Sequence, residues 1–440
     1  MTAANAKALA ATGSSLRLAQ FRTIALLFVG YAACYYCRAD LSVATPLLVE
    51  ELGRRGVGHA EAVVHIGTIT SLGVFAYAIG KLFLTGLGDY WGGRRNFLIG
   101  VGGATLFTLM FAASGTLPLF TLAWVANRLT QSVGWAGLIK VSSKWFDFSS
   151  YGTVVGILSI SYLVGDALAR QQMGMLIESG YGWRGLFVFA GLIAGMALLA
   201  NLLFLRESRA DEGHPEAKPN PLNLFAATEA APASITALLV PLFRSRAFML
   251  VCLLSFACTI IRETFNTWNP NYLHDLGFSM SRSATLSAIF PAVGAVSVLV
   301  AGWVSDKLGL GGRSLLMFTG LAATAAALTA LSFVHPGSSA TALPVLIIGV
   351  VAFCLLGPYS YLGGAFALDF GGKQASAASS GIIDGIGYLG GVLAGDSVAR
   401  LAGALGWERV FLVLAAVSAV AAVCAGALHV LNLRAARINS

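Results

Sequence analysis

The stretch GWVSDKLGLGGR, residues 302–313, places an acid, a lysine and an arginine among glycines at the end of an apolar run. An earlier stretch, LGDYWGGRR at residues 87–95, has a similar order: an acid, then glycines, then arginines, again after an apolar run. A signal that occurs once in each half of a chain indicates an internal duplication. The two stretches therefore predict a chain built from two related halves.

The composition indicates an integral membrane protein. Of the 440 residues, 57% are hydrophobic and only 11% are charged, whereas an average soluble domain has about 25% charged residues. A helix needs about 20 mostly apolar residues to cross a bilayer, and such runs recur along the whole chain. We place the spans at residues 23–49, 62–87, 95–115, 117–143, 152–178, 184–206, 246–273, 284–305, 313–334, 341–368, 375–403 and 408–433. The sequence therefore predicts an all-α membrane protein with twelve transmembrane helices in two pseudo-symmetric six-helix bundles.

A long polar segment, rich in Pro and Ala, separates the sixth span from the seventh. The expected organisation is a cytoplasmic N-terminal segment (1–22), an N-terminal six-helix bundle (23–206), a cytoplasmic central loop (207–245), a C-terminal six-helix bundle (246–433) and a cytoplasmic tail (434–440). With the N-terminus inside, the inside segments carry about sixteen Lys and Arg residues and the outside loops about five, and positively charged loops stay cytoplasmic. We expect a multi-pass, monomeric protein of the cell (inner) membrane with both termini in the cytoplasm.

Three cations interrupt the apolar runs. Arg38 and Arg262 lie near the middle of the first span of each half, and Lys81 lies about two thirds along the second span. A charge at the bilayer centre costs about 2.5–3.5 kcal/mol on insertion scales, so it needs a partner or a water-lined cavity. The guanidinium group presents its donors in a fixed fork that suits an oxyanion. We therefore expect an anionic substrate that carries a phosphate.

These cations and the tyrosines near them could instead have structural roles. Arg38 could pair with Asp40 and Arg262 with Glu263, but residues one or two apart do not face each other on a helix, so we do not expect these pairs. Lys81 could extend its amine to the membrane surface. The hydroxyl groups of nearby tyrosines could donate to a phosphate or sugar oxygen, although ordinary helix packing explains each of them equally well. These tyrosines are Tyr31, Tyr35 and Tyr77.

Two motifs resemble those of the major facilitator superfamily. The first is the loop motif that ends at Gly309 and contains Asp306, and the second is Arg128-x-x-Gln131-x-x-Gly134 in the fourth span. The resemblance implies alternating access. In the loop motif, a carboxylate near a helix end and an arginine across the interface hold the two halves in one conformation. The candidates for gating or coupling are Asp89, Arg94, Asp306, Arg128, Asp166 and Asp384.

Four further stretches resemble the organophosphate:phosphate antiporters, the family of glycerol-3-phosphate and hexose-phosphate transporters. They are GYAACYYCRADLSVATP (30–46), YAIGKLFLTGLGD (77–89), GWAGLIKVSSKWF (134–146) and IIRETFNTWNPNYL (260–273). The resemblance implies that Arg38 and Arg262 hold the phosphate and that Lys81 lies nearby. It also implies that Tyr31, Tyr35, Tyr77 and Tyr388 line the site.

Two departures bear on the substrate. Where glycerol-3-phosphate transporters of the family have a histidine in helix five, this chain has Gly165 followed by Asp166. The stretches that contain Asp369 and Asp384 are more similar to those of eukaryotic sugar-phosphate exchangers. The organic part of the substrate therefore stays open.

The sequence favours a secondary active transporter that exchanges an organophosphate, such as glycerol-3-phosphate or a sugar phosphate, for inorganic phosphate. One alternative is a proton-coupled organic-anion symporter in which Asp40, Asp166, Glu263 or Asp384 carries the proton. The other is a non-transporting sugar-phosphate sensor. We do not expect the protein to be an enzyme, or to have a cofactor, a metal site or a nucleic-acid partner. The sequence shows no nucleotide-binding, nucleophile or metal-ligand motif.

Overall fold

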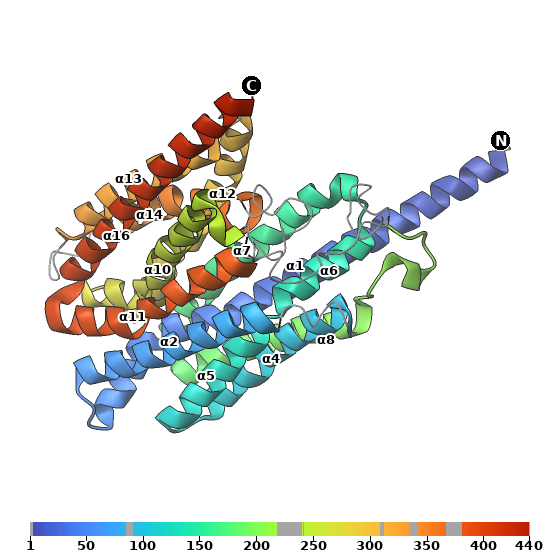
Figure 1. Ribbon diagram of the computed structural model, residues 1–440. Helices are drawn as coiled ribbons and strands as arrows, with labels where there is room; N and C mark the ends of the chain where they lie inside the picture. The colour runs from blue at the N-terminus through green and yellow to red at the C-terminus, as the bar shows by residue number, and fades with distance from the viewer. Residues whose placement is uncertain are drawn as a thin grey trace.

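The computed structural model describes residues 3–84, 91–217, 240, 242–308, 312–334, 342–366 and 381–439. The described part of the first half is helical almost throughout (Figure 1). Its helices are α1 (Ala3–Arg54), α2 (His59–Phe83), α4 (Gly93–Ala113), α5 (Leu117–Gln131), α6 (Gly134–Trp145), α7 (Phe148–Glu178) and α8 (Trp183–Phe204), followed by a 3-10 turn, η2 (Arg209–Glu212).

The second half is also helical in its described part. It consists of α10 (Arg246–Asp275), α11 (Met280–Ser287), α12 (Ile289–Leu308), α13 (Gly312–Leu331), α14 (Leu343–Tyr359), a π-helical turn η3 (Leu362–Phe366), a helix at 381–391, a 3-10 turn η4 (Val392–Ala394) and α16 (Asp396–Asn439). Among the described residues, eight helical segments are long and apolar enough to cross a membrane. The chain is therefore an all-α membrane protein, as the sequence predicts.

Several expected spans are divided or extended. The fourth span, 117–143, consists of α5 and α6, and the eighth, 284–305, corresponds to α11 and α12. The expected boundary between 403 and 408 coincides with Gly406, whose φ of 80° breaks the helical path inside α16. A left-handed φ of this kind strains any residue with a Cβ atom, which explains the glycine. Helix α1 begins at Ala3, well before the start expected at residue 23.

The helices before residue 205 form one bundle and those after residue 245 form another. In the first bundle α1 packs on α7 and α8, and in the second α13 packs on α14 and α16. The two bundles meet where α7 contacts α11 and α12, where α2 contacts α16, and where α1 contacts α10 (Figure 1). The site described below lies among these interface helices.

Small residues permit a close approach of α2 and α16. A Cβ atom at Gly67 would lie 2.6 Å from the Cβ of Ala399 and 2.9 Å from the carbonyl oxygen of Gly395. The hydroxyl of Ser71 donates to the carbonyl of Val392 at 2.6 Å. Small residues and side-chain hydroxyls are the usual means of helix association in membranes. This part of the interface between the bundles is therefore tightly closed.

A carboxylate connects helices within the first bundle. Glu207 follows α8 and accepts hydrogen bonds from the backbone N–H groups of Gly93 (2.9 Å) and Arg94 (2.7 Å), at the start of α4. It also pairs with Lys144 of α6 at 2.7 Å. Burial raises the pKa of Glu207, but the bond from Lys144 and the two N–H donors outweigh burial, so its pKa lies below the usual value. Glu207 thus connects three helices.

We expect Glu207→Gln to lower the thermal unfolding midpoint of the purified protein by a few degrees at pH 7. Because the folded pKa is depressed, the stabilising contribution is complete above the usual carboxylate pKa, near 4.5, and is lost as the pH falls through the lower folded value. The difference between the variant and the natural protein should therefore shrink in acid. Glu178→Gln, at the exposed end of α7, is the control and should not change the midpoint. Equal midpoints for Glu207→Gln and the natural protein at pH 7 would show that the contacts of Glu207 do not stabilise the folded protein.

Candidate substrate site

A cavity lies between the two bundles, lined by residues of α1, α2, α5 and α7 from the first bundle and of α10, α12 and α14 from the second. The charged residues that line the cavity, in the described part of the chain, are Arg38, Arg128, Arg170, Arg262, Asp166 and Glu263. Five of the residues singled out from the sequence as site or gating candidates line it: Tyr35, Arg38, Arg128, Asp166 and Arg262. The fold therefore brings the first-span arginines of the two halves to one cavity, as expected.

Arg38 is positioned by its neighbours on three sides. Its Nε donates to Oε1 of Gln131 at 2.7 Å, and its Nη1 donates to the hydroxyl of Tyr35 at 3.1 Å. The guanidinium carbon lies 4.5 Å from the ring centroid of Tyr35 and 4.4 Å from that of Tyr77. Its Nη2 is buried and has no partner among the described residues. The side chain is thus held rigidly and retains a donor for a ligand.

Arg262 occupies the equivalent position in the second bundle. Its Nη2 donates to Oε1 of Glu263 at 2.5 Å and to the hydroxyl of Tyr388 at 3.0 Å. The expectation that Glu263 does not reach Arg262 is therefore wrong. Both side chains are more than nine-tenths buried, so no water competes, and their length spans the angle between adjacent helix positions. The Nε of Arg262 is buried without a partner in the described part of the chain.

Lys81 makes an ion pair between the bundles, with its Nζ 3.5 Å from Oδ2 of Asp384. It also lies 5.7 Å from the ring centroid of Tyr77, which is 4.8 Å from the ring of Tyr388. These residues pack beside the cavity. Tyr31 is buried against Tyr35 and against Trp135 of α6.

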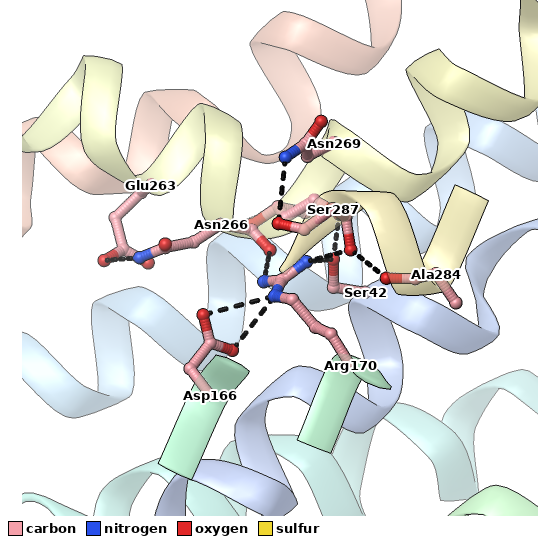
Figure 2. Close-up of polar contacts among 9 residues, drawn as sticks. Ser42, Asp166, Arg170, Glu263, Asn266, Asn269, Ala284 and Ser287 are labelled. Atoms are coloured by element: carbon pink, nitrogen blue, oxygen red, sulfur yellow. Dashed lines mark hydrogen bonds and ion pairs between the residues drawn. The ribbon is translucent and has the colours of Figure 1, made fainter. Parts of the chain in front are cut away.

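Asp166 pairs with Arg170 one turn further along α7, at 3.2 Å (Figure 2). Arg170 also donates from Nη2 to the carbonyl of Asn266 in α10 at 2.7 Å. Its Nη1 donates to the hydroxyls of Ser287 in α11 at 3.2 Å and of Ser42 in α1 at 3.5 Å. Figure 2 shows the guanidinium group at the centre of these partners. Arg170 thus ties the first bundle to the second.

The sequence reasoning did not single out Arg170. The sequence does contain a signal for Arg170, because an Asp and an Arg four residues apart on an apolar helix can form a pair. Arg94, expected in gating, donates to the carbonyls of Leu205 and Leu202 at the end of α8, at 2.6 and 2.8 Å. The other gating candidates, Asp89 and the side chain of Asp306, lie outside the described residues, as does Asp369.

The charges around the cavity are unevenly compensated. Arg170 and Arg262 each contact an acid, Asp166 and Glu263. In the described part of the chain, neither Arg38 nor Arg128 has a carboxylate within ion-pair distance. A buried donor left without a partner costs about 1–3 kcal/mol, and more for a charged group. The cavity is therefore suited to receive an anion.

The chain belongs to the major facilitator superfamily, whose family model matches residues 27–395. Several solved structures share the fold. One is a D-xylose-proton symporter, with a TM-score of 0.72 and 13% identity, for which the match covers 92% of this chain and 97% of the other. Another is a bacterial homologue of the human lysosomal transporter Spinster, with a TM-score of 0.71 and 15% identity over 94% and 98% of the two chains.

Relatives in sequence indicate a narrower family within the superfamily. A probable hexose phosphate transport protein of Chlamydia muridarum is 25% identical over 90% of this chain and 88% of the relative. The membrane sensor protein UhpC of Escherichia coli is 25% identical over 90% and 89%, and sugar phosphate exchanger 3 of Homo sapiens is 25% identical over 80% and 77%. These relatives are consistent with the organophosphate:phosphate antiporter family.

Proposed function

We propose that this protein exchanges a phosphorylated small molecule for inorganic phosphate by alternating access, in an inner membrane with both termini in the cytoplasm. The observation that carries the proposal is the pair of unpartnered guanidinium donors in the described part of the chain, Nη2 of Arg38 and Nε of Arg262, at one cavity between the bundles. Charge-assisted bonds from two arginine forks are the usual means of holding a phosphate. The relatives named above support a phosphorylated substrate.

The geometry also suggests why exchange would be obligatory. Arg38 belongs to the first bundle and Arg262 to the second, so a phosphate bound by both would join the bundles across the cavity. Without it, two guanidinium groups of like charge face a low-dielectric space, and their repulsion opposes closure. Bound phosphate removes that repulsion. We therefore propose that the carrier changes conformation readily only when it is loaded.

The test is uptake of radiolabelled phosphate into proteoliposomes. Liposomes preloaded with phosphate should take up label at least tenfold faster than empty ones, without a pH gradient. Protein-free liposomes and protein inactivated by heat provide the background. Equal uptake into empty and loaded liposomes would contradict exchange, and an absence of both uptake and phosphate binding would contradict the phosphate site itself.

A second candidate function, proton-coupled anion transport, is favoured by one residue. Of the four acids considered as proton carriers, Asp166, Glu263 and Asp384 contact cations. Asp40 is fully buried, and its Oδ1 accepts the N–H of Leu41, at 2.7 Å. Its Oδ2 has no partner within the described residues. Uptake into empty liposomes that depends on an imposed pH gradient and is lost in Asp40→Asn would support this alternative.

A further inference from the structure

A second group of unpartnered donors lines the same cavity, on α2 and α5. The hydroxyl of Thr70, the indole N–H of Trp124 and the Nε of Arg128 are buried and have no partner in the described part of the chain. All three residues are at most 5% exposed. Arg128 also has no acid within ion-pair distance among the described residues.

Gly73 brings these side chains together. A Cβ atom at Gly73 would lie 2.5 Å from Nε1 of Trp124 and 3.0 Å from Cγ of Arg128, so both side chains cover the bare backbone of α2. Thr70 lies three residues before Gly73 and therefore on the same face of the helix. The three side chains thus lie at one turn of α2.

These donors differ from most comparable side chains in the described part of the chain, although the hydroxyl of Thr259 also lacks a partner there. Other threonines within helices, such as Thr45 and Thr105, donate to the carbonyl four residues earlier, which is the local alternative open to Thr70. The buried indole N–H groups of Trp145 and Trp268 donate to backbone carbonyls. Buried tryptophan N–H groups usually find an acceptor. A ligand would supply the acceptor that this group lacks.

The chemistry of the donors defines the ligand. Tryptophan and arginine side chains only donate, so the ligand group must accept several hydrogen bonds at once. A single water has two acceptor positions for three donors, and only Thr70 could accept from it in return. The uncompensated charge of Arg128 selects an anion. A carboxylate satisfies each of these conditions.

We propose that Thr70, Trp124 and Arg128 form a second anion subsite, which binds the carboxylate of a phosphorylated carboxylic acid whose phosphate lies between Arg38 and Arg262. The position of the phosphate rests on the proposed function. The guanidinium carbons of Arg38 and Arg128 lie 4.4 and 5.0 Å from the centroid of the Tyr77 ring, so they are at most 9.4 Å apart. This upper limit is short enough for one small molecule to reach both subsites.

Two matched compounds test the subsite. 3-Phosphoglycerate and glycerol 3-phosphate differ in that a carboxylate replaces a hydroxymethyl group. We expect 3-phosphoglycerate to inhibit phosphate exchange at a concentration at least tenfold lower, a difference of about 1.4 kcal/mol. Trp124→Phe and Thr70→Val, which remove one donor each, should reduce this ratio at least threefold, and Arg128→Gln should abolish it.

Thr105→Val is the matched control, because its hydroxyl bonds its own helix and does not line the cavity. It should leave the ratio unchanged. A natural protein that does not prefer 3-phosphoglycerate, or a ratio that survives in all three variants, overturns the subsite. If phosphate exchange is absent altogether, the binding of 3-phosphoglycerate is measured by calorimetry, which tests the subsite independently of exchange. Binding that Trp124→Phe weakens supports the subsite. Binding that is absent, or that Trp124→Phe does not change, overturns it.

Discussion

Arg38→Lys is expected to reduce the initial rate of phosphate exchange at least 100-fold. Arg38 uses separate nitrogens for Gln131 and Tyr35 and keeps Nη2 for the ligand. The single ammonium group of lysine cannot reproduce this fork, and it loses the planar stacking on Tyr35 and Tyr77. Loss of two charge-assisted bonds, about 1.5–3 kcal/mol each, corresponds to a factor of 100 or more.

The measurement is phosphate uptake into phosphate-loaded proteoliposomes, with the amount of reconstituted protein determined for each variant. Arg54→Lys is the matched control, because its side chain is 72% exposed and makes a surface ion pair with Glu51. That variant should exchange phosphate at the natural rate. If Arg38→Lys stays within threefold of the natural rate while folded, the forked contact to phosphate is wrong.

The fold could be predicted because its signals are local. Runs of apolar residues define membrane helices directly, since the bilayer requires a fixed length of chain. The positions of Arg38 and Arg262 in matching spans also placed them at a common cavity, because a duplicated architecture brings equivalent helices together at its axis. The structure places both of them there.

The partners of these residues could not be predicted, because they depend on contacts between helices. Lys81 meets Asp384 from a helix some 300 positions later, and no spacing rule connects them. Gly73 gives no sign in the sequence that Trp124 and Arg128 lie over it. Arg262 pairs with Glu263 although residues one apart do not face each other on a helix surface. That rule describes exposed helices and does not hold where both side chains are buried and water is excluded.

Arg170→Gln is expected to increase the reactivity of a cysteine introduced at Thr285 toward a membrane-impermeant maleimide at least tenfold. Arg170 connects α7 to Asn266 of α10 and Ser287 of α11, and Thr285 is half-buried against Gly174 at the same interface. Breaking a buried ion pair by removing one partner costs about 3–5 kcal/mol. A cost of this size moves the equilibrium away from the conformation that the pair stabilises.

The comparison uses Thr285→Cys alone and combined with Arg170→Gln or with Asp166→Asn. Both combinations should react faster, because Asp166 holds the guanidinium through Nε. Lys144→Gln is the matched control, since it breaks an ion pair with Glu207 inside the first bundle and should leave the reactivity unchanged. Equal rates for Arg170→Gln and its parent would show that Arg170 does not hold this interface closed.

Phosphate should alter the rate at which Thr285→Cys reacts with the maleimide, because a chain of contacts joins Arg262 to the interface between the bundles. Arg262 donates to Glu263, Glu263 accepts from the side-chain amide of Asn266 at 3.3 Å, and the backbone carbonyl of Asn266 accepts from Arg170. A phosphate at Arg262 competes with Glu263 for the guanidinium group and so disturbs the support of Asn266. We therefore expect phosphate to change the labelling rate of Thr285→Cys in the presence of Arg170 and to have no effect in Arg170→Gln. A phosphate effect of equal size in both backgrounds would show that the signal does not pass through Arg170.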